Sequence, residues 1–358
     1  MPRRTATMLA STLLFIALLC AGVLMPVPYA ELGPGPTVNT LGEHDGEPVL
    51  KISGHKTYPA RGHLNMTTVR VTGADYRMNM VEAVVGWLGH DKVVVPHDTL
   101  YPDDKTPEQV DQENAEDFSL SQENAKVAAL RELDIEVGTR VIVDSVVKDG
   151  PSDGKLHAGD VIRAVDGQKV DRAEDIRTFV TKHKPGQQVV FTVVPAGVAK
   201  GNDANRAPTR DVTVTATRAK DDGRAMVGLQ AGVEHTFPFT IDIKLADVGG
   251  PSAGLMFALG LIDKLEPGDL TGGEFVAGTG TIDEDGNVGP IGGIQLKTIA
   301  ARDEGATYFL TPEANCATAA KDVPGGLTLV KVGTLDDALA ALEDIREHRT
   351  DELPSCEG

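Results

Sequence analysis

The chain has 358 residues, 41% of them hydrophobic, which is enough for two or three domains with sizeable cores. Its 53 acidic and 34 basic residues give a formal net charge of −19, which argues against broad binding to nucleic acid or anionic lipid. Three cysteines are too few for a disulfide scaffold, and no C-x-x-C or H-E-x-x-H pattern is present, so the sequence indicates neither a metal nor a cofactor.

The first 30 residues have the pattern of a membrane anchor. Arg3 and Arg4 precede an uncharged apolar run over 8–25, which predicts a span with its basic end in the cytoplasm. A cleaved signal peptide is the alternative, but 28–30 is a poor small-residue cleavage site. We therefore expect residues 1–30 to remain as an anchor and the rest of the chain to be extracytoplasmic.

Residues 31–119 read as a small β-rich region followed by a linker. Short strand-like runs occur at 49–52, 64–71 and 92–95. We expect Trp87, Met78 and Met80 to supply packing for this region rather than ligand contacts. The acidic, glutamine-rich stretch that follows is expected to be a linker that leads to a helix over 123–133.

Residues 120–218 resemble a PDZ domain of the bacterial protease-associated type. The features that carry the resemblance are, in order, a strand at 137–143, a small-residue turn at 150–152, the Ala-Gly-Asp-Val-Ile strand at 158–162, the Asp-Gly turn at 166–167 and a helix at 173–182.

A strand edge that begins at a glycine turn is able to accept an extended peptide by β-augmentation. The candidate peptide-binding residues are Gly138, Thr139, Arg140 and Val141. The alternative is a module that packs between its neighbours and binds no peptide.

A glycine-rich stretch at 248–259 places one serine, Ser252, directly before an apolar run. Its glycines permit close approaches that a Cβ would prevent, and Pro251 fixes φ before the serine. A helix that starts here would point free N–H groups toward the serine, where negative charge is favoured. The pattern suits a nucleophile beside an oxyanion site; a tight turn with a serine N-cap is the simpler interpretation of the motif alone.

The base for this serine is expected to be a lysine. Residues 250–254 match the nucleophile elbow of α/β-hydrolases, but the only downstream histidine, His348, lies in a charged terminal run, so we reject that mechanism. Burial lowers the pKa of a lysine and makes it a usable base. Among the downstream lysines only Lys297 has an apolar, glycine-rich setting, 288–301. On its own Lys297 would be interpreted as a surface helix lysine.

Three glycine-marked motifs and this lysine together resemble the proteolytic domain of the Lon family of serine proteases, which use a Ser–Lys dyad. The motifs are 250–254, then 278–280 and 286–293, with Lys297 following. The resemblance covers about residues 225–345 and leaves a polar tail at 346–358. Together with the anchor and the PDZ-like block, it suggests a membrane-anchored, PDZ-containing Lon-like protease with an α+β fold.

The resemblance implies roles for individual residues. Ser252 would be the nucleophile and Lys297 the general base, with Thr279 orienting the lysine. Backbone amides around the serine, those of Gly250 and Ala253, would stabilise the oxyanion. The family commonly has an acidic residue three positions before the serine. This chain has Gly249 there, which puts an acidic contribution at that corner in doubt.

The resemblance also implies partners. The sequence has no G-x-x-x-x-G-K-[ST] loop, so we expect ATP-independent cleavage of unfolded proteins, loops or tails, without a cofactor. A hexamer is suspected only by analogy with Lon relatives. A catalytically silent PDZ adaptor, and a protease that cleaves only itself or one partner, are the alternatives. Cys316 and Cys356 could form a disulfide outside the cytoplasm or remain unpaired.

Overall fold

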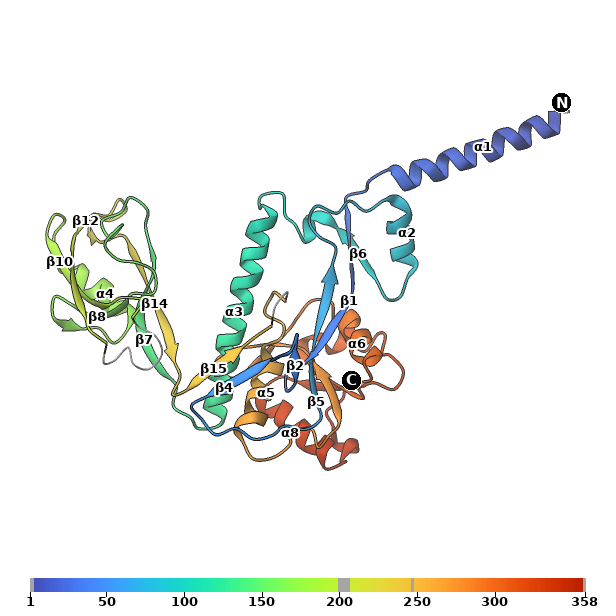
Figure 1. Ribbon diagram of the computed structural model, residues 1–358. Helices are drawn as coiled ribbons and strands as arrows, with labels where there is room; N and C mark the ends of the chain where they lie inside the picture. The colour runs from blue at the N-terminus through green and yellow to red at the C-terminus, as the bar shows by residue number, and fades with distance from the viewer. Residues whose placement is uncertain (1–2, 199–206, 246–247, 357–358) are drawn as a thin grey trace. The chain divides into compact units, whose positions relative to one another are not determined.

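The computed structural model describes residues 3–198, 207–245 and 248–356, which form two compact units. The first unit combines Met1–Lys51, Lys56–Ala129 and Asp242–Gly358, and the second combines Ile52–His55 and Leu130–Ile241 (Figure 1). The second unit is therefore an insertion in the sequence of the first. The mixture of helices and strands agrees with the predicted α+β class.

The helices are α1 (Arg3–Leu24), α2 (Met80–Leu88), α3 (Pro107–Glu132), α4 (Ala173–Val180), α5 (Gly254–Leu265), α6 (Ile294–Asp303), α7 (Cys316–Ala319) and α8 (Leu335–Arg346). The strands are β1 (Tyr29–Asn39), β2 (Glu43–His44), β3 (Glu47–Pro48), β4 (Leu50–Ser53), β5 (His63–Val71), β6 (Val93–Pro96), β7 (Gly138–Val146), β8 (Val161–Val165), β9 (Gln168–Lys169), β10 (Gln188–Val194), β11 (Arg210–Thr215), β12 (Thr217–Arg218), β13 (Ala225–Met226), β14 (Leu229–Thr236), β15 (Thr240–Ile243), β16 (Phe275–Gly278), β17 (Thr281–Ile282), β18 (Val288–Gly289), β19 (Tyr308–Pro312) and β20 (Thr328–Val332).

A mixed sheet organises the first unit, with the strand order β20-β19-β16-β5-β1-β6. Strands β20, β19, β16 and β5 are parallel, whereas β1 is antiparallel to both β5 and β6. Strands from 31–119 thus continue the sheet that residues 275–332 begin. This differs from the separate β-rich region expected from the sequence, because strand patterns along the chain do not reveal which distant strands will pair.

Helix α5 is the central helix of this unit. Every one of its residues except Lys264 is buried, as expected for a helix that is apolar on all sides. It packs against β5, and α6 packs against β1 and β5 (Figure 1). The two elements expected to carry the serine and the lysine therefore meet the same strand.

Helix α3 begins much earlier than the sequence analysis expected. The polar stretch interpreted as a linker is its first half. Thr106 and Gln109 explain the start: the Gln109 amide donates to Thr106 Oγ1, and the Thr106 amide donates to Gln109 Oε1. A proline follows at the first helical position. The capping box and this proline are both sequence signals for the start of a helix, and the expectation of a linker did not take them into account.

The second unit is a sheet with the order β11-β10-β8-β7-β14, which packs with α4 around a core of valines and isoleucines centred on Phe191. Alternate residues of β10 point into this core, as its period-2 burial shows. The helix expected at 173–182 is α4, which ends at Val180.

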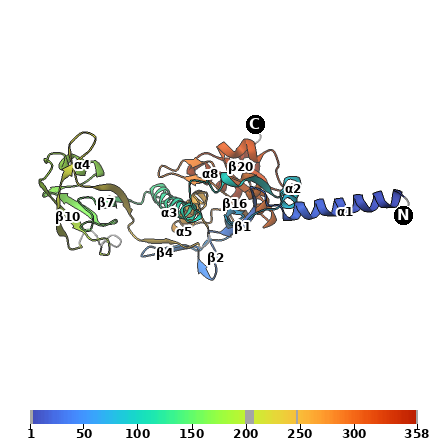
Figure 2. The same cartoon turned by 90° about the horizontal axis from the view of Figure 1, so that it is seen from above.

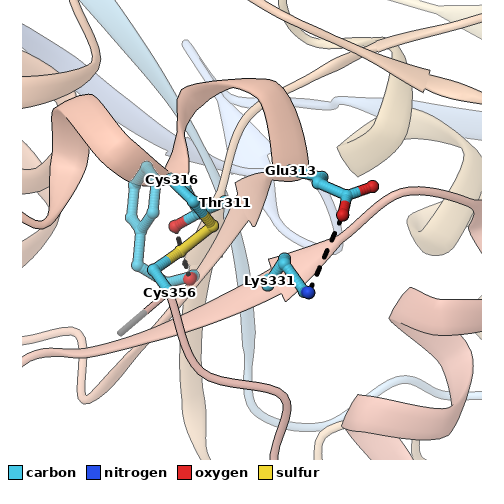
Figure 3. The surroundings of a disulfide bond; sticks show 6 residues. Thr311, Glu313, Cys316, Lys331 and Cys356 are labelled. Carbon is cyan, nitrogen blue, oxygen red and sulfur yellow. Dashed lines mark hydrogen bonds and ion pairs between the residues drawn. A yellow bond between two sulfur atoms is a disulfide. The ribbon is translucent and has the colours of Figure 1, made fainter. Parts of the chain in front are cut away.

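The C-terminal segment is tied to the first unit. Cys316, at the start of α7, forms a disulfide with Cys356 (Figure 3). The Lys331 amide of the edge strand β20 donates to the Pro354 carbonyl at 2.8 Å. Of the two alternatives that the sequence left open, the structure therefore has the bonded one, and residues 354–356 of the expected tail are held against β20 and α7.

Candidate active site

Ser252 lies in a turn that leads into α5, where it is partly exposed to solvent. Gly250 has φ +79°, a conformation that favours glycine. Helix α3 holds the turn from one side: Ser121 Oγ donates to the Pro251 carbonyl at 2.9 Å, and the Gly250 amide donates to the Asn114 carbonyl at 2.9 Å. The serine is therefore positioned by a helix far away in the sequence.

Lys297 lies in the first turn of α6, with only 2% of its surface exposed. The helix starts at Gly293, which has φ +69° and whose carbonyl accepts the Lys297 amide. A Cβ on Gly293 would lie 2.8 Å from Cγ2 of Val69, so only glycine lets α6 approach β5 this closely. The buried side chain places Nζ 2.8 Å from Ser252 Oγ.

Strand register brings two threonines to the same amine. Met66 of β5 pairs with Gly278 of β16 in parallel register, so Thr67 and Thr279 follow them side by side. Lys297 Nζ donates to the Thr67 carbonyl at 2.8 Å and to Thr279 Oγ1 at 3.0 Å. With the turn that carries Ser252 and with α6 itself, four separate segments thus meet at this nitrogen.

The hydrogen-bond pattern assigns the protons of a neutral lysine. Thr279 Oγ1 gives its only hydrogen to the Ser252 carbonyl at 3.0 Å, so it can only accept from Nζ. The Thr67 carbonyl is also an acceptor only. These two acceptors use both hydrogens of a neutral amine, which leaves the Nζ lone pair directed at Ser252 Oγ. This arrangement suits a general base placed beside a hydroxyl nucleophile.

Burial makes the neutral amine accessible near physiological pH. Desolvation lowers the pKa of Lys297 from 10.5 to about 7. Burial alone accounts for the lowered pKa of Lys297. In lysines activated by another cation, a neighbouring positive charge lowers the pKa instead. A base with a pKa close to 7 is matched to proton transfer at neutral pH.

The two amides expected to form the oxyanion site differ in the hydrogen-bond acceptors that the structure gives them. The Gly250 amide already has an acceptor, the Asn114 carbonyl, which corrects the expectation that it is available to a substrate. Ala253 is the N-cap residue of α5, and amides at a helix N-terminus have no acceptor within the helix. Asp247, the nearest upstream acidic residue, lies outside the described residues.

The expected peptide-binding strand of the second unit is not a free edge. Residues Gly138–Val141 of β7 pair with Val233–Thr236 of β14, and Arg140 forms an ion pair with Glu234 at 2.7 Å. These four residues therefore lie on an inner strand of the described sheet and not on its end strand. The end strands of this sheet are β11 and β14, and β14 lies beyond residues 120–218, on which the resemblance to a PDZ domain rested.

A cavity of about 1190 Å³ lies beside β14 within the second unit. Ile176 and Val180 of α4 form part of its wall, and Leu229 and Ala231 of β14 form another part. Its rim carries more basic than acidic side chains, in contrast to the acidic chain as a whole. An edge strand, an apolar groove and a basic rim suit an extended peptide with an anionic end.

Comparisons with known proteins match one family in each unit, although the PDZ match begins within α3, most of which belongs to the first unit. Residues 246–343 match the C-terminal proteolytic domain of Lon protease (S16), and residues 110–200 match the PDZ domain. The chain contains a Lon proteolytic domain and a PDZ domain. The first is the domain of a serine peptidase, and its matched range includes Ser252, Thr279 and Lys297.

Each individual relative covers less than a third of the chain. Lon protease 1 of Sorangium cellulosum is 36% identical over 111 residues, which is 29% of this chain and 13% of that protein. The PDZ domain of an SdrC-like protein from Listeria innocua is 24% identical, covers 26% of this chain and 92% of its own, and has a TM-score of 0.22. A Geobacillus thermodenitrificans structure is 26% identical over 23% of this chain and 82% of its own, with a TM-score of 0.18.

Two contributors to the site lie outside the matched proteolytic range. The Thr67 carbonyl comes from β5, and Ser121 comes from α3. No motif marks either residue, because one acts through its backbone and the other through contact with a turn. In the described parts of the chain, no group of three or more His, Cys, Asp or Glu side chains is arranged to hold a metal ion.

Proposed function

We propose that this chain is a membrane-anchored serine endopeptidase that cleaves extracytoplasmic proteins or peptides without ATP, with Ser252 as nucleophile and Lys297 as general base. The observation that carries the proposal is the 2.8 Å contact between Lys297 Nζ, buried and with its pKa lowered to about 7, and Ser252 Oγ. The match of 246–343 to a Lon proteolytic domain supports it.

Acylation would start with the transfer of the Ser252 proton to Lys297 while Oγ attacks the substrate carbonyl carbon. The ammonium formed on Nζ keeps its bonds to the Thr67 carbonyl and Thr279 Oγ1, so it is stabilised where it forms. The oxyanion would be held by amides at the start of α5, including that of Ala253, with the helix dipole adding to the stabilisation.

Collapse of the tetrahedral intermediate would break the C–N bond while Lys297 returns the proton to the leaving amine. A water molecule would then give its proton to the neutral lysine and attack the acyl-enzyme, which releases the carboxyl product and restores the Ser252 hydroxyl. Thr279 would orient the lysine through both half-reactions, since its hydroxyl links Nζ to the Ser252 carbonyl.

Two features support an anchored, extracytoplasmic location. One helix segment, Arg4–Val23, is long and apolar enough to cross a membrane, a property that signal sequences share. The Cys316–Cys356 disulfide suits an oxidising compartment. The absence of a nucleotide-binding P-loop from the sequence fits a peptidase that takes segments already unfolded.

The PDZ domain would recruit substrate. An extended peptide would pair with the outer edge of β14 and place alternate side chains in the groove beside α4. Occupation of this groove would raise the local concentration of unfolded segments for the peptidase.

The direct test compares casein cleavage by the wild type and Ser252→Ala. We expect the variant to lose activity and to unfold at the same denaturant concentration, because Ser252 is partly exposed. Retained cleavage would remove Ser252 as the nucleophile. Wild type that leaves casein intact but shortens itself in a Ser252-dependent manner, seen by intact mass, would favour self-processing, and peptide binding without any cleavage would favour the silent adaptor.

A further inference from the structure

Helix α2 exposes its largest apolar side chains. Val81, Val84, Val85 and Leu88 follow the i, i+3, i+4, i+7 spacing of one helix face, and all four are exposed, Leu88 by 77%. Trp87, expected to be packed, is 54% exposed. Of the other two residues expected to supply packing, Met78 is buried and Met80 is 41% exposed.

The side of α2 that faces the protein carries small residues instead. Ala83 and Gly86 are buried against the sheet, and a Cβ on Gly86 would lie 2.5 Å from Cγ2 of Val94 in β6. Small residues thus seat the helix closely on the sheet while the large ones face outward. A helix in water normally has the opposite arrangement, so a further apolar partner is expected over the outer face.

The candidate membrane span lies next to this face. Gly22 of α1 is in reach of Val81: a Cβ on the glycine would lie 3.7 Å from Cγ2 of the valine. The Val27 amide donates to the Met78 carbonyl at 2.8 Å, and this fixes the start of α2 beside the end of α1 (Figures 1 and 2). The apolar surface of α2 therefore continues that of α1.

Aromatic residues mark the same level. Tyr29, five residues beyond the end of α1, makes an edge-to-face contact with Trp87 at a centroid distance of 5.1 Å. Tyrosine and tryptophan are enriched where a membrane protein crosses the boundary between lipid and water. The pair lies where that boundary falls if α1 spans the bilayer.

We propose that α2 is an interfacial helix, with its 81/84/85/88 face and Trp87 inserted among the headgroups and upper acyl chains of the bilayer that α1 crosses. The inference rests on the proposed anchor. The partner is neutral lipid rather than anionic lipid, because the chain carries a net charge of −19 and the nearby Lys92 is paired with Glu31 at 2.8 Å. Insertion would hold the β1–β6 end of the first unit at the membrane surface.

Trp87 is the only tryptophan in the chain, so its fluorescence reports on α2 alone. The full chain is reconstituted into phosphatidylcholine vesicles that carry bromine near the carboxyl end of the acyl chain, near the methyl end, or not at all. We expect the shallow bromines to remove about half of the emission and the deep ones clearly less, as for a helix buried about 5–10 Å into the interface.

The double variant Val85→Glu/Leu88→Glu should lose this quenching while it still floats with the vesicles and cleaves casein. Both side chains are exposed, so the charges do not disturb the core. Val323→Glu, at another exposed valine of the same unit, is the control and should be quenched like the wild type.

The outcomes separate the two proposals. A chain that does not float with vesicles overturns the anchor, and the interfacial helix with it. Flotation with a Trp87 that bromine does not quench overturns the interfacial helix alone. If that unquenched Trp87 is also shielded from aqueous acrylamide, and dilution with lipid removes the shielding, a second copy of the chain covers α2 instead.

Discussion

The candidate active site and the peptide groove of the PDZ domain differ in how their polar atoms are used. Around Lys297 the partners are already in place: Thr67 and Thr279 each offer an acceptor oxygen within 3.0 Å of Nζ, and the Ser252 hydroxyl lies 2.8 Å from it. Along β14 the outer edge has no strand beside it in the sheet as described, and the adjoining cavity is large.

This difference follows from what each site would do. Proton transfer requires a base whose protonation and direction are fixed before substrate arrives, so a closed network suits it. Peptide capture requires backbone groups that stay available, so an open edge suits it. Changes at the first site should therefore alter kcat, and changes at the second should alter KM.

Replacement of the base should have the largest effect. Lys297→Met is expected to lower kcat/KM for casein by at least about 10⁴-fold, since base and nucleophile act as a unit. In the wild type kcat/KM should rise about tenfold per pH unit below 7 and level off above it, because only the neutral amine accepts the Ser252 proton. A flat profile from pH 5 to 9 would contradict the assignment.

Lys264→Met is the matched control. Lys264 is also partly buried, and burial lowers its pKa, but its Nζ donates to the Leu41 carbonyl, away from the serine. This variant should keep its activity. Loss of activity in both variants would point to a general effect of lysine removal rather than to a base.

Lys297→Met should also stabilise the fold. Between pH 7 and 10.5 the unfolded Lys297 binds a proton that the folded one does not, so the stability of the wild type rises with pH in that window. Lys297→Met should remove this slope. Its gain in unfolding free energy, about a few kcal/mol at about 1.4 kcal/mol per pKa unit, should be greatest below pH 7 and smaller at pH 9 in urea titrations.

Sequence motifs predicted which side chains meet at the candidate active site but not the residues that surround them. Ser252, Thr279 and Lys297 each stand in a glycine-marked motif, and the structure brings their side chains together. Thr67 and Ser121 could not be predicted, because the first depends on the register of β5 with β16 and the second on helix packing. Such long-range placements leave no local pattern.

The end strand of the PDZ sheet could not be predicted for a related reason. Four residues of β7 have the alternation and glycine start of a peptide-binding strand, but local pattern does not show which strand is at the edge. The edge strand β14 begins about ninety residues after the start of β7. Because β14 pairs with β7, β7 is not the last strand of the sheet. The expectation for Trp87 of α2 differed for another reason. An apolar side chain predicts an apolar partner, but it does not show whether that partner is the core of the protein.

An intermediate effect should come from the threonine that orients the base. Thr279→Val keeps the shape but leaves Nζ with one acceptor fewer and the Ser252 carbonyl with only the Gly280 amide as donor. We expect kcat to fall about 10- to 100-fold with little change in KM, and the kinetic pKa to fall as the ammonium loses an acceptor. Thr279→Ser should restore most of both.

Thr311→Val serves as the control for that change. Thr311 is also fully buried in the same unit, but its hydroxyl donates to the Phe309 carbonyl and has no contact with Lys297 in the bonds described. If this variant lowered kcat and moved the pH profile as much as Thr279→Val, the effect would belong to buried threonines in general and not to orientation of the base.

The smallest effect should come from the groove. Ala231→Glu places a bulky anion on β14 inside the cavity, where it should oppose an anionic peptide. We expect KM for casein to rise about three- to tenfold with kcat unchanged, because recruitment raises local concentration without changing the chemistry. Val233→Glu is the matched control: Val233 is two residues along the same strand, exposed and outside the cavity lining, and its variant should behave like the wild type. Short peptides that reach Ser252 without the groove should be cleaved equally by all three proteins. A fall in kcat for Ala231→Glu on those peptides would mean that the groove acts on catalysis itself, and the separation between the two sites would be lost.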